Sequence, residues 1–485
     1  MRGIMKAIAT LLVLGVVAGA VYASAVSSAH RESEHSVNLI RDWLNERSDV
    51  RVRRLQYDRD TLGGAIHYDI ELTPDADSPL FPALVALTGA QDAPEHRLQG
   101  TIDLRFGPWV PDHGLAAMVG EEFIPWDNGY VDAFEDGPQA GDRFARLVIE
   151  RELGGATDVR LSVDDVDLVL KDGGDRLLWS GFDMALRLSA ARRSLDYSGQ
   201  LDRFELKGPE IELEMENTGF AGRAERADQV WEGRNFRWHL HRLDLVDNNQ
   251  QLRMHLRGGH ATATVERIDG LDQVDVRFGI DQFAYQDQPL GGLELDVVMN
   301  RIDTEAAREL IEQQQQSPDP DIRSEAELRQ VRDALRRFHE AGPRVEDGRL
   351  ALTDGESPLL ELRFSGQING DAIAALPADA ERQTLDRHVL NAAAFDAEGE
   401  LSANAYSHLA RLVVLANEPL GEAARDSNQL ASEAALYQVI IEMAALQMPF
   451  IRRLEGGGLA LDLSLREGWF LSGDERFARL EDMLD

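Results

Sequence analysis

The stretch DQVDVRFGIDQFAY at 272–285 alternates apolar with charged or polar residues. Successive side chains of a β-strand point to opposite faces, so this alternation predicts a strand with one covered face and one face in water. Six more stretches between about 100 and 300 share the pattern: RLSVDDVDLVL (160–170), RLLWSGFDMALRLSA (176–190), PEIELEMENT (209–218), NFRWHLHRLDLV (235–246), QLRMHLRGG (251–259) and GGLELDVVMN (291–300). Gly, Asn and Asp separate these stretches, which favours an antiparallel sheet.

The flanking sequence predicts hairpins and helices. Gly63-Gly64 separates the alternating runs at 50–57 and 66–72, which predicts a β-hairpin. After residue 300 the period changes to that of helices, with Asp303 or Thr304 as an N-cap. The further elements expected are helices at 302–316 and 324–341, a strand hairpin at 348–370, a strand and helix at 395–417, a helix at about 428–453, and a hairpin with a helix at 474–484.

These elements predict a mainly β fold with α-helices (α+β). A single N-terminal transmembrane helix is followed by a long twisted antiparallel sheet with helices packed on one face. The expected organisation is a cytoplasmic tip and anchor at 1–29, a juxtamembrane helix at 30–48, a β-rich periplasmic region at 49–300, and a mixed α/β region at 301–485 on the same sheet.

The anchor is expected in the uncharged segment at 7–26. Twenty helical residues span about 30 Å, the thickness of the hydrocarbon core of a bilayer. Arg2 and Lys6 precede the segment, so the positive-inside rule places the N-terminus in the cytoplasm and the remainder in the periplasm. Ala23-Ser24-Ala25 also resembles a signal-peptidase site, which leaves cleavage as the alternative to retention.

Composition excludes several classes of function. The chain has 86 acidic and 50 basic residues, a net charge of −36, so a nucleic-acid partner is not expected. It contains no cysteine, which rules out thiol catalysis and cysteine-ligated zinc or iron–sulfur clusters. No phosphate-binding loop, nucleophile elbow, dinucleotide fingerprint or EF-hand motif occurs. The sequence predicts a non-enzymatic protein without catalytic residues, metal sites or cofactors.

The histidines and paired carboxylates are better explained as surface residues. His239 and His241 share one face of a predicted strand, and His255 and His260 follow one hairpin later. Such a set suits zinc or copper, but the apolar residues of the strand at 235–246 lie on the opposite face, so the histidines are expected in water. The neighbours Asp164 and Asp165 point to opposite faces of a strand and do not act jointly on one bond.

Two tryptophans are the candidate contact residues. Trp109 and Trp126 flank a stretch rich in Pro and Gly, GPWVPDHGLAAMVGEEFIPWDNGY. One interpretation is that they close the end of the sheet. The other is that they contact a lipid or a protein partner, because Trp favours surfaces that are apolar on one side and wet on the other.

The order of several motifs resembles the YdgA-like family of uncharacterised bacterial envelope proteins. The motifs are YDRDTLGGAIHYDIEL (57–72), RFGPWVP (105–111), GGLELDVVMNRIDTEAAREL (291–310), GESPLLELRFSGQING (355–370) and LREGWFLSGDERFARLEDML (465–484). The resemblance implies a single-pass inner-membrane protein with an uncleaved anchor and a large periplasmic part. It implies no active site. Phe106 stands where the family has His, which argues against a catalytic role for that segment.

Three functional hypotheses follow from the sequence. The first is an envelope protein that binds or shields a lipid in a curved sheet. The second is a periplasmic scaffold or homo-oligomer that contacts envelope proteins through the helices at 302–341 and 428–453, and the third is an unassigned hydrolase. A concave apolar surface would favour the first, a solvated sheet with apolar helix stripes the second, and convergent buried polar groups the third.

Overall fold

In the residues that it describes, the computed structural model is mostly antiparallel β-structure. It describes residues 41, 50–60, 63–72, 96–106, 113, 116, 118–125, 139, 141–152, 154–169, 176–227, 230–249, 252–286, 288–316, 325–355, 357–377, 382–405, 408, 427–445 and 447–480. The chain divides into two compact units, Met1–Gly233 and Arg234–Asp485, called unit 1 and unit 2 below.

Unit 1 is an antiparallel sheet built largely from hairpins. Its strands are β1 (Val50–Arg59), β2 (Gly63–Leu72), β3 (His96–Phe106), β4 (Met118–Pro125), β5 (Arg143–Arg151), β6 (Thr157–Val163), β7 (Val166–Val169), β8 (Arg176–Ser180), β9 (Phe182–Leu188), β10 (Ser194–Lys207) and β11 (Ile211–Ala227). Strands β1 to β6 pair in order, β9 joins β6 to β10, and β7 continues through β8 to the other half of β10. The hairpin predicted around Gly63-Gly64 is confirmed, because β1 pairs with β2 up to Arg59 and Gly64.

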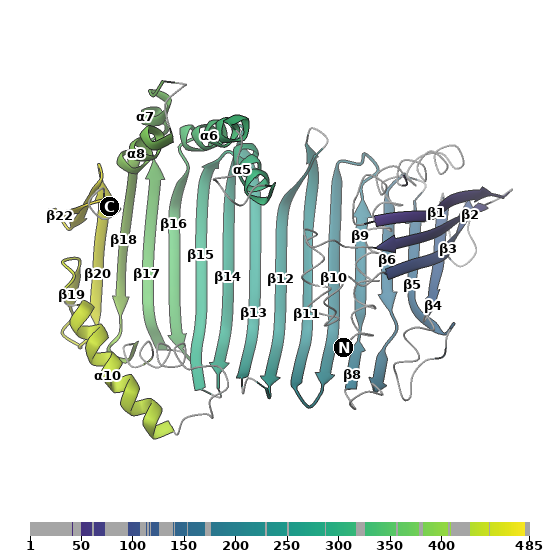
Figure 1. Cartoon of the computed structure of the whole chain (residues 1–485), viewed down its shortest axis with the longest axis horizontal. Helices are drawn as coiled ribbons and strands as arrows, with labels where there is room; N and C mark the ends of the chain where they lie inside the picture. The colour runs from purple at the N-terminus through teal and green to yellow at the C-terminus, as the bar shows by residue number, and fades with distance from the viewer. Residues whose placement is uncertain are drawn as a thin grey trace. The chain divides into compact units, whose positions relative to one another are not determined.

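The core of unit 1 forms because the sheet folds over itself. In Figure 1, β1 to β3 run across the direction of β5, β6 and β9. Apolar residues from both directions form one buried cluster, in which Ile70, Ile102, Leu161 and Trp179 are each no more than 3% exposed. This arrangement resembles the orthogonal packing of two sheet layers, whose inward side chains meet in one core.

Unit 2 is an antiparallel sheet in which successive strands pair from β12 (Val230–Asp247) to β18 (Ala393–Leu401). Strand β12 begins at the end of unit 1 and belongs to unit 2 from Arg234 onward. The other strands of unit 2 are β13 (Leu252–Ile268), β14 (Leu271–Tyr285), β15 (Gln288–Ile302), β16 (Arg344–Asp354), β17 (Ser357–Ile368), β19 (Ile451–Arg453), β20 (Leu459–Arg466), β21 (Trp469–Ser472) and β22 (Glu475–Arg479). Strand β20 pairs with β18, β19 and β21. The hairpin expected within 348–370 is confirmed, with Asp354 opposite Ser357 at its turn.

The helices of unit 2 lie between successive strands along the chain. They are α5 (Thr304–Gln316), α6 (Glu325–Glu340), α7 (Gly370–Ala374), α8 (Arg382–Ala392) and α10 (Ser427–Ala445). Helices α5 and α6 connect the paired strands β15 and β16, α7 and α8 connect β17 and β18, and α10 precedes β19, which pairs with β20 rather than with β18. Asp303 is the N-cap of α5, as one of the two predicted residues, because its Oδ1 accepts a hydrogen bond of 2.9 Å from the amide of Ala306.

The prediction of helices packed on one face of the sheet is wrong. Among the described residues the helices are few, and none of them packs on a sheet face. Figure 1 shows α5 to α8 at the ends of the strands of unit 2 rather than across them. The physical reason is the antiparallel connectivity. Helices α5 and α6 connect the end of β15 to the start of its neighbour β16, and these two points lie at the same end of the strands, so the connection does not cross the sheet. The helix predicted at 474–484 is also wrong where it is described, because Glu475–Arg479 is β22.

The predicted membrane anchor is not supported. Within the part of the chain that the structure describes, no helix is both long and apolar enough to cross a membrane. The segment at 7–26 lies outside the described residues, as does the predicted juxtamembrane helix at 30–48 apart from residue 41. The expectation of a single-pass inner-membrane protein with its bulk in the periplasm is therefore withdrawn.

Candidate binding face

The strands of both units share a local irregularity that keeps one face apolar. In several strands of each unit the apolar alternation shifts by one residue at a pair of adjacent positions, and within each unit the strand registers align these pairs into a line that we call the crease. The pairs are Asp164-Asp165, Ser180-Gly181, Asp202-Arg203 and Glu216-Asn217 in unit 1, and His241-Arg242, Arg257-Gly258, Asp281-Gln282 and Gly291-Gly292 in unit 2. Without the shift, every side chain beyond the crease would point to the wrong face.

Two glycines show why the crease needs its residues. Gly181 and Gly258 have φ of 65° and 64°, in the left-handed region that favours glycine. A Cβ on either residue would also collide with the carboxylate across the strand pair, that of Asp202 or that of Asp281. The same glycine–aspartate pairing thus bends the strands in unit 1 and in unit 2.

In unit 2 the result is a continuous apolar surface, here called the apolar face. Three successive rows cross eight paired strands, β12 to β18 and β20. The first row is Leu240, Gly259, Ile280, Leu293, Leu352, Leu360, Leu401 and Leu459; the second is Trp238, Ala261, Phe278, Leu295, Leu350, Leu362, Gly399 and Leu461; the third is Phe236, Ala263, Val276, Val297, Gly348, Phe364, Ala397 and Leu463. Every position is glycine or apolar.

The reverse side of the same strands, here called the charged face, is mostly polar, with Ala351 and Ala460 as buried apolar positions. The row adjoining the second apolar row is Arg237, Thr262, Arg277, Asp296, Arg349, Arg363, Glu398 and Asp462. Arg349 bridges neighbouring strands, with its Nη1 2.8 Å from Glu294 and its Nε 3.6 Å from Glu361. The pKa of Glu361 lies below its ordinary value, mainly because Arg363 donates a hydrogen bond to this carboxylate. The positive charge of Arg349 lowers it further. The charged side chains of this face are therefore satisfied by water and by ion pairs with one another.

The apolar face is incompletely buried. Phe236 is 39% exposed, while Trp238, Phe278 and Leu295 are half-buried and Leu240 is buried. No described helix packs across it. Among the described residues, strands β13 to β15 of unit 2 have no large apolar side chain that is fully buried. Unit 1, in contrast, has an extensive cluster of buried apolar side chains. An apolar surface of this extent on a folded protein indicates an interaction site.

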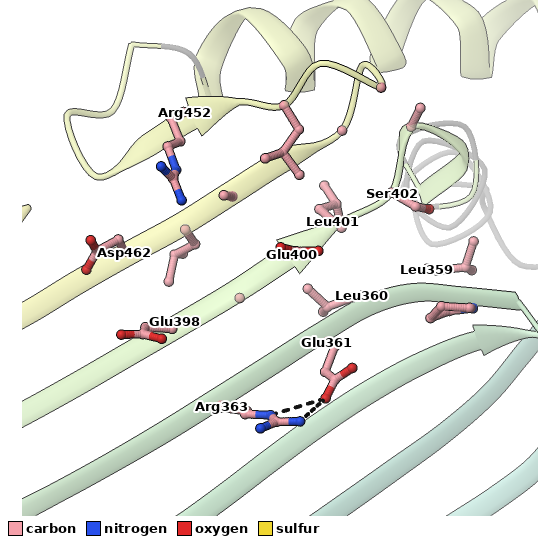
Figure 2. A pocket seen from close by; sticks show the side chains of 18 residues that line it. Leu359, Leu360, Glu361, Arg363, Glu398, Glu400, Leu401, Ser402, Arg452 and Asp462 are labelled. Carbon is pink, nitrogen blue, oxygen red and sulfur yellow. Dashed lines mark hydrogen bonds and ion pairs between the residues drawn. The ribbon is translucent and has the colours of Figure 1, made fainter.

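An open groove of about 790 Å³ lies beside β17, β18 and β20 (Figure 2). Both faces of these strands contribute to its lining, since Leu360, Leu401 and Leu461 belong to the apolar face and Glu398 and Glu400 to the charged face. The only interaction drawn in Figure 2 is that of Arg363 with Glu361, at 3.0 Å. Glu398 lies directly opposite Asp462, and like charges in such a cross-strand pair repel one another.

Unit 1 contains a buried titratable pair that sequence reasoning missed. The Tyr68 hydroxyl donates a hydrogen bond of 2.7 Å to Oε1 of Glu122, and both side chains are buried. Oε2 of Glu122 has no hydrogen-bond partner among the described residues. Burial raises the pKa of Glu122 to about 7 against the hydrogen bond from Tyr68, and burial also raises the pKa of Tyr68. The alternation in β4 did not predict that Glu122 pairs with Tyr68, because Glu122 stands at a position where the alternation predicts an apolar side chain.

The residues predicted from sequence as contacts or ligands are placed as follows. Trp109 and Trp126 lie outside the described residues. His239 lies opposite His260 on the charged face, both exposed, and His255 Nδ1 lies 2.8 Å from Asp244 Oδ1. Within the described ranges no group of three or more His, Cys, Asp or Glu side chains is arranged to hold a metal ion.

Asp164 and Asp165 form one of the residue pairs of the crease, and each makes its own hydrogen bond there. Arg143 donates to Asp164 with an Nε–Oδ2 distance of 2.6 Å, and the amide of Gly181 donates to Oδ1 of Asp165 at 3.0 Å. Their two partners lie on different strands. The structure therefore gives each carboxylate a separate structural contact and does not bring the two together.

Comparison with protein families assigns the chain. The model of a family described as "Bacterial protein of unknown function (DUF945)" matches residues 4–471. The chain belongs to this family. The name YdgA-like is not confirmed by the match. The searches of the curated proteins and of the solved structures gave no significant match.

Proposed function

We propose that this member of the family is a non-enzymatic binding protein that holds the acyl chains of a lipid on the apolar face of unit 2. The observation that carries the proposal is the set of three apolar rows across eight paired strands, with no charged or hydrogen-bonding side chain apart from the indole of Trp238. An acyl chain is the occupant that such a surface fits, because it needs burial and no polar contact.

The dimensions of the apolar face also favour acyl chains. Seven gaps between eight strands, each about 4.8 Å, give an apolar length of about 34 Å. That length is close to the ~30 Å hydrocarbon core of a bilayer, which two layers of acyl chains fill end to end. A row of the apolar face therefore has room for an extended chain lying across the strands.

A protein partner fits this surface less well. Protein interfaces carry about one hydrogen bond per 100–200 Å², and their polar rims supply it. The backbone groups of the central strands are paired within the sheet, so the apolar face offers dispersion contacts and almost nothing else. A dimer formed by two such faces remains the competing occupant, since two sheets pack face to face about 10 Å apart.

The test uses the full chain and a fluorescent fatty acid, cis-parinaric acid, titrated in buffer without vesicles. Ala261→Glu places a carboxylate on the apolar face, and its matched control Thr262→Glu places one on the next residue, which is exposed on the charged face. We expect Ala261→Glu to weaken binding at least tenfold, and Thr262→Glu to change it by less than twofold, because a buried charge must be desolvated.

Two outcomes would contradict the proposal. The first is the absence of saturable binding by the unaltered chain, and the second is equal binding by the two variants. Light scattering on the same samples identifies the competing occupant. A dimer that Ala261→Glu dissociates and that binds no fatty acid would assign the apolar face to a second copy of the chain.

A further inference from the structure

Helix α10 exposes the side of itself that a soluble helix normally buries. Leu436, Val439, Ile440 and Met443 are 62%, 53%, 51% and 60% exposed. They occupy positions i, i+3, i+4 and i+7 and thus share one face of the helix. We call them the α10 stripe. Nearby Met448, between α10 and β19, is 43% exposed as well.

The α10 stripe adjoins the apolar surface of the sheet. Tyr437, on the flank of the helix, is partly buried against the same apolar cluster as Tyr285 and Leu290 of the sheet. Tyr285 ends the row Leu245–Met254–Tyr285, which continues the apolar face beyond the crease. Helix α10 and strands β14 and β15 therefore share one apolar cluster, and the exposed stripe lies on the same helix as the cluster member Tyr437.

The charges near the stripe select the kind of surface that it meets. Helix α10 contains Glu433 and Glu442 and no basic residue. The carboxylate of Glu442 lies 2.8 Å from Nη2 of Arg453, and the whole chain carries a net charge of −36. Such a helix gains nothing from anionic headgroups, whereas its apolar stripe suits the interface of a neutral or zwitterionic lipid layer.

We infer that the α10 stripe docks on the surface of a zwitterionic lipid layer, so that acyl chains reach the apolar face of unit 2 from that surface. This inference rests on the proposed function and adds to it the source of the ligand. The contact is peripheral: the stripe lies in the interface and no helix spans the layer. Leu and Met side chains supply apolar contact that adapts to a disordered surface.

The experiment is flotation of the full chain with vesicles of pure phosphatidylcholine. Met443→Glu and Ile440→Glu place charges on the stripe, whose members are exposed, so both variants are expected to fold. Gln438→Glu is the matched control, because residue 438 lies on the opposite side of the helix. We expect each stripe variant to lower the floated fraction at least fivefold, and the control to keep it within twofold.

A second readout separates this inference from the proposed function. Binding of cis-parinaric acid without vesicles should stay within twofold in Met443→Glu, because the stripe supplies the docking contact and not the apolar face. Equal flotation of Met443→Glu and the unaltered chain, or no flotation at all, would overturn the inference while leaving vesicle-free binding intact. Dissociation of an oligomer by Met443→Glu, without flotation, would assign the stripe to a protein partner instead. If the unaltered chain does not bind cis-parinaric acid without vesicles, that result would instead contradict the proposed function.

Discussion

Units 1 and 2 contain the same kind of strand but differ in how far its apolar face is buried. Both have strands with a crease, at Gly181 in one and at Gly258 in the other, and both keep one face apolar. In unit 1 the part of that face that contains Trp179 is covered by β1 to β3, and Trp179 is 3% exposed, whereas Phe220 on β11 is 39% exposed. In unit 2 no described helix covers it, and Phe236 is 39% exposed.

This difference separates stability from function. Burial of apolar area is the main favourable term in folding, so unit 1 has the contacts that stabilise its own fold. The face of unit 2 is equally apolar but contributes less to folding because it stays half in water. We therefore expect substitutions in unit 1 to lower the free energy of unfolding, and substitutions on the apolar face of unit 2 to lower binding.

The largest contrast is expected between Trp179→Ala in unit 1 and Phe278→Ala in unit 2. Trp179 is buried beside Phe144 and donates from Nε1 to the carbonyl of Asp164 at 3.0 Å. Its removal should destabilise unit 1 by about 3–5 kcal/mol, through lost contacts and a cavity. Half-buried Phe278 should contribute about 1 kcal/mol. Urea unfolding of both variants measures the difference, and equal losses would show that the two faces are equally important for stability.

Glu122→Gln is expected to stabilise unit 1 at neutral and alkaline pH. The pKa of Glu122 is about 7 in the folded chain against an ordinary 4.5, because of burial. The folded chain then holds a proton that the unfolded chain releases, so the unfolding free energy falls as pH rises from about 4.5 to 7. That loss amounts to about 3 kcal/mol.

The glutamine variant keeps an acceptor for Tyr68 and cannot ionise. Its unfolding free energy should exceed that of the unaltered chain above pH 7 and match it near pH 4.5. Urea unfolding at pH 4.5, 6 and 8 provides the comparison. A difference that stays constant across this range would show that the carboxyl group does not titrate there.

A smaller and equal loss is expected in both units from alanine at the crease. Gly181→Ala and Gly258→Ala each put a Cβ on a residue with positive φ and against an aspartate. Each should cost about 1–2 kcal/mol from the left-handed backbone. The double variants with Asp202→Ala or Asp281→Ala should recover only the part due to the collision. Full recovery would mean that the backbone at the crease is not strained.

Part of this organisation was predictable from the sequence. The alternation in DQVDVRFGIDQFAY predicted strand β14, and Gly63-Gly64 and Asp354-Gly355 predicted turns, because these signals are local. The stretch that contains Trp179 and Phe182 was predicted as one alternating strand. The structure shows one apolar face, with the alternation shifted at Gly181. The repeated pairs of non-apolar residues, one in each strand that crosses the crease, were the signal for this shift.

Other features depend on contacts that no local pattern contains. The packing of β1 to β3 over β5, β6 and β9 joins Ile70 to Leu161 across about 90 residues, so alternation alone did not indicate which face would be covered. Helices α5 and α6 have the composition of packed helices, yet the antiparallel neighbours β15 and β16 place them at a strand end. The Glu122 carboxyl is paired because Tyr68 lies two strands away, which the sequence near Glu122 does not show.

The most direct test of the account is to map where a fatty acid binds. The full chain is loaded with a palmitic acid that carries a photoreactive diazirine on its chain, irradiated and digested, and the modified residues are located by mass spectrometry. We predict that adducts concentrate on the apolar face of unit 2, at residues such as Trp238, Phe278 and Leu350. Adducts confined to the charged face or to unit 1, or saturable binding without any adduct on β12 to β18, would contradict it.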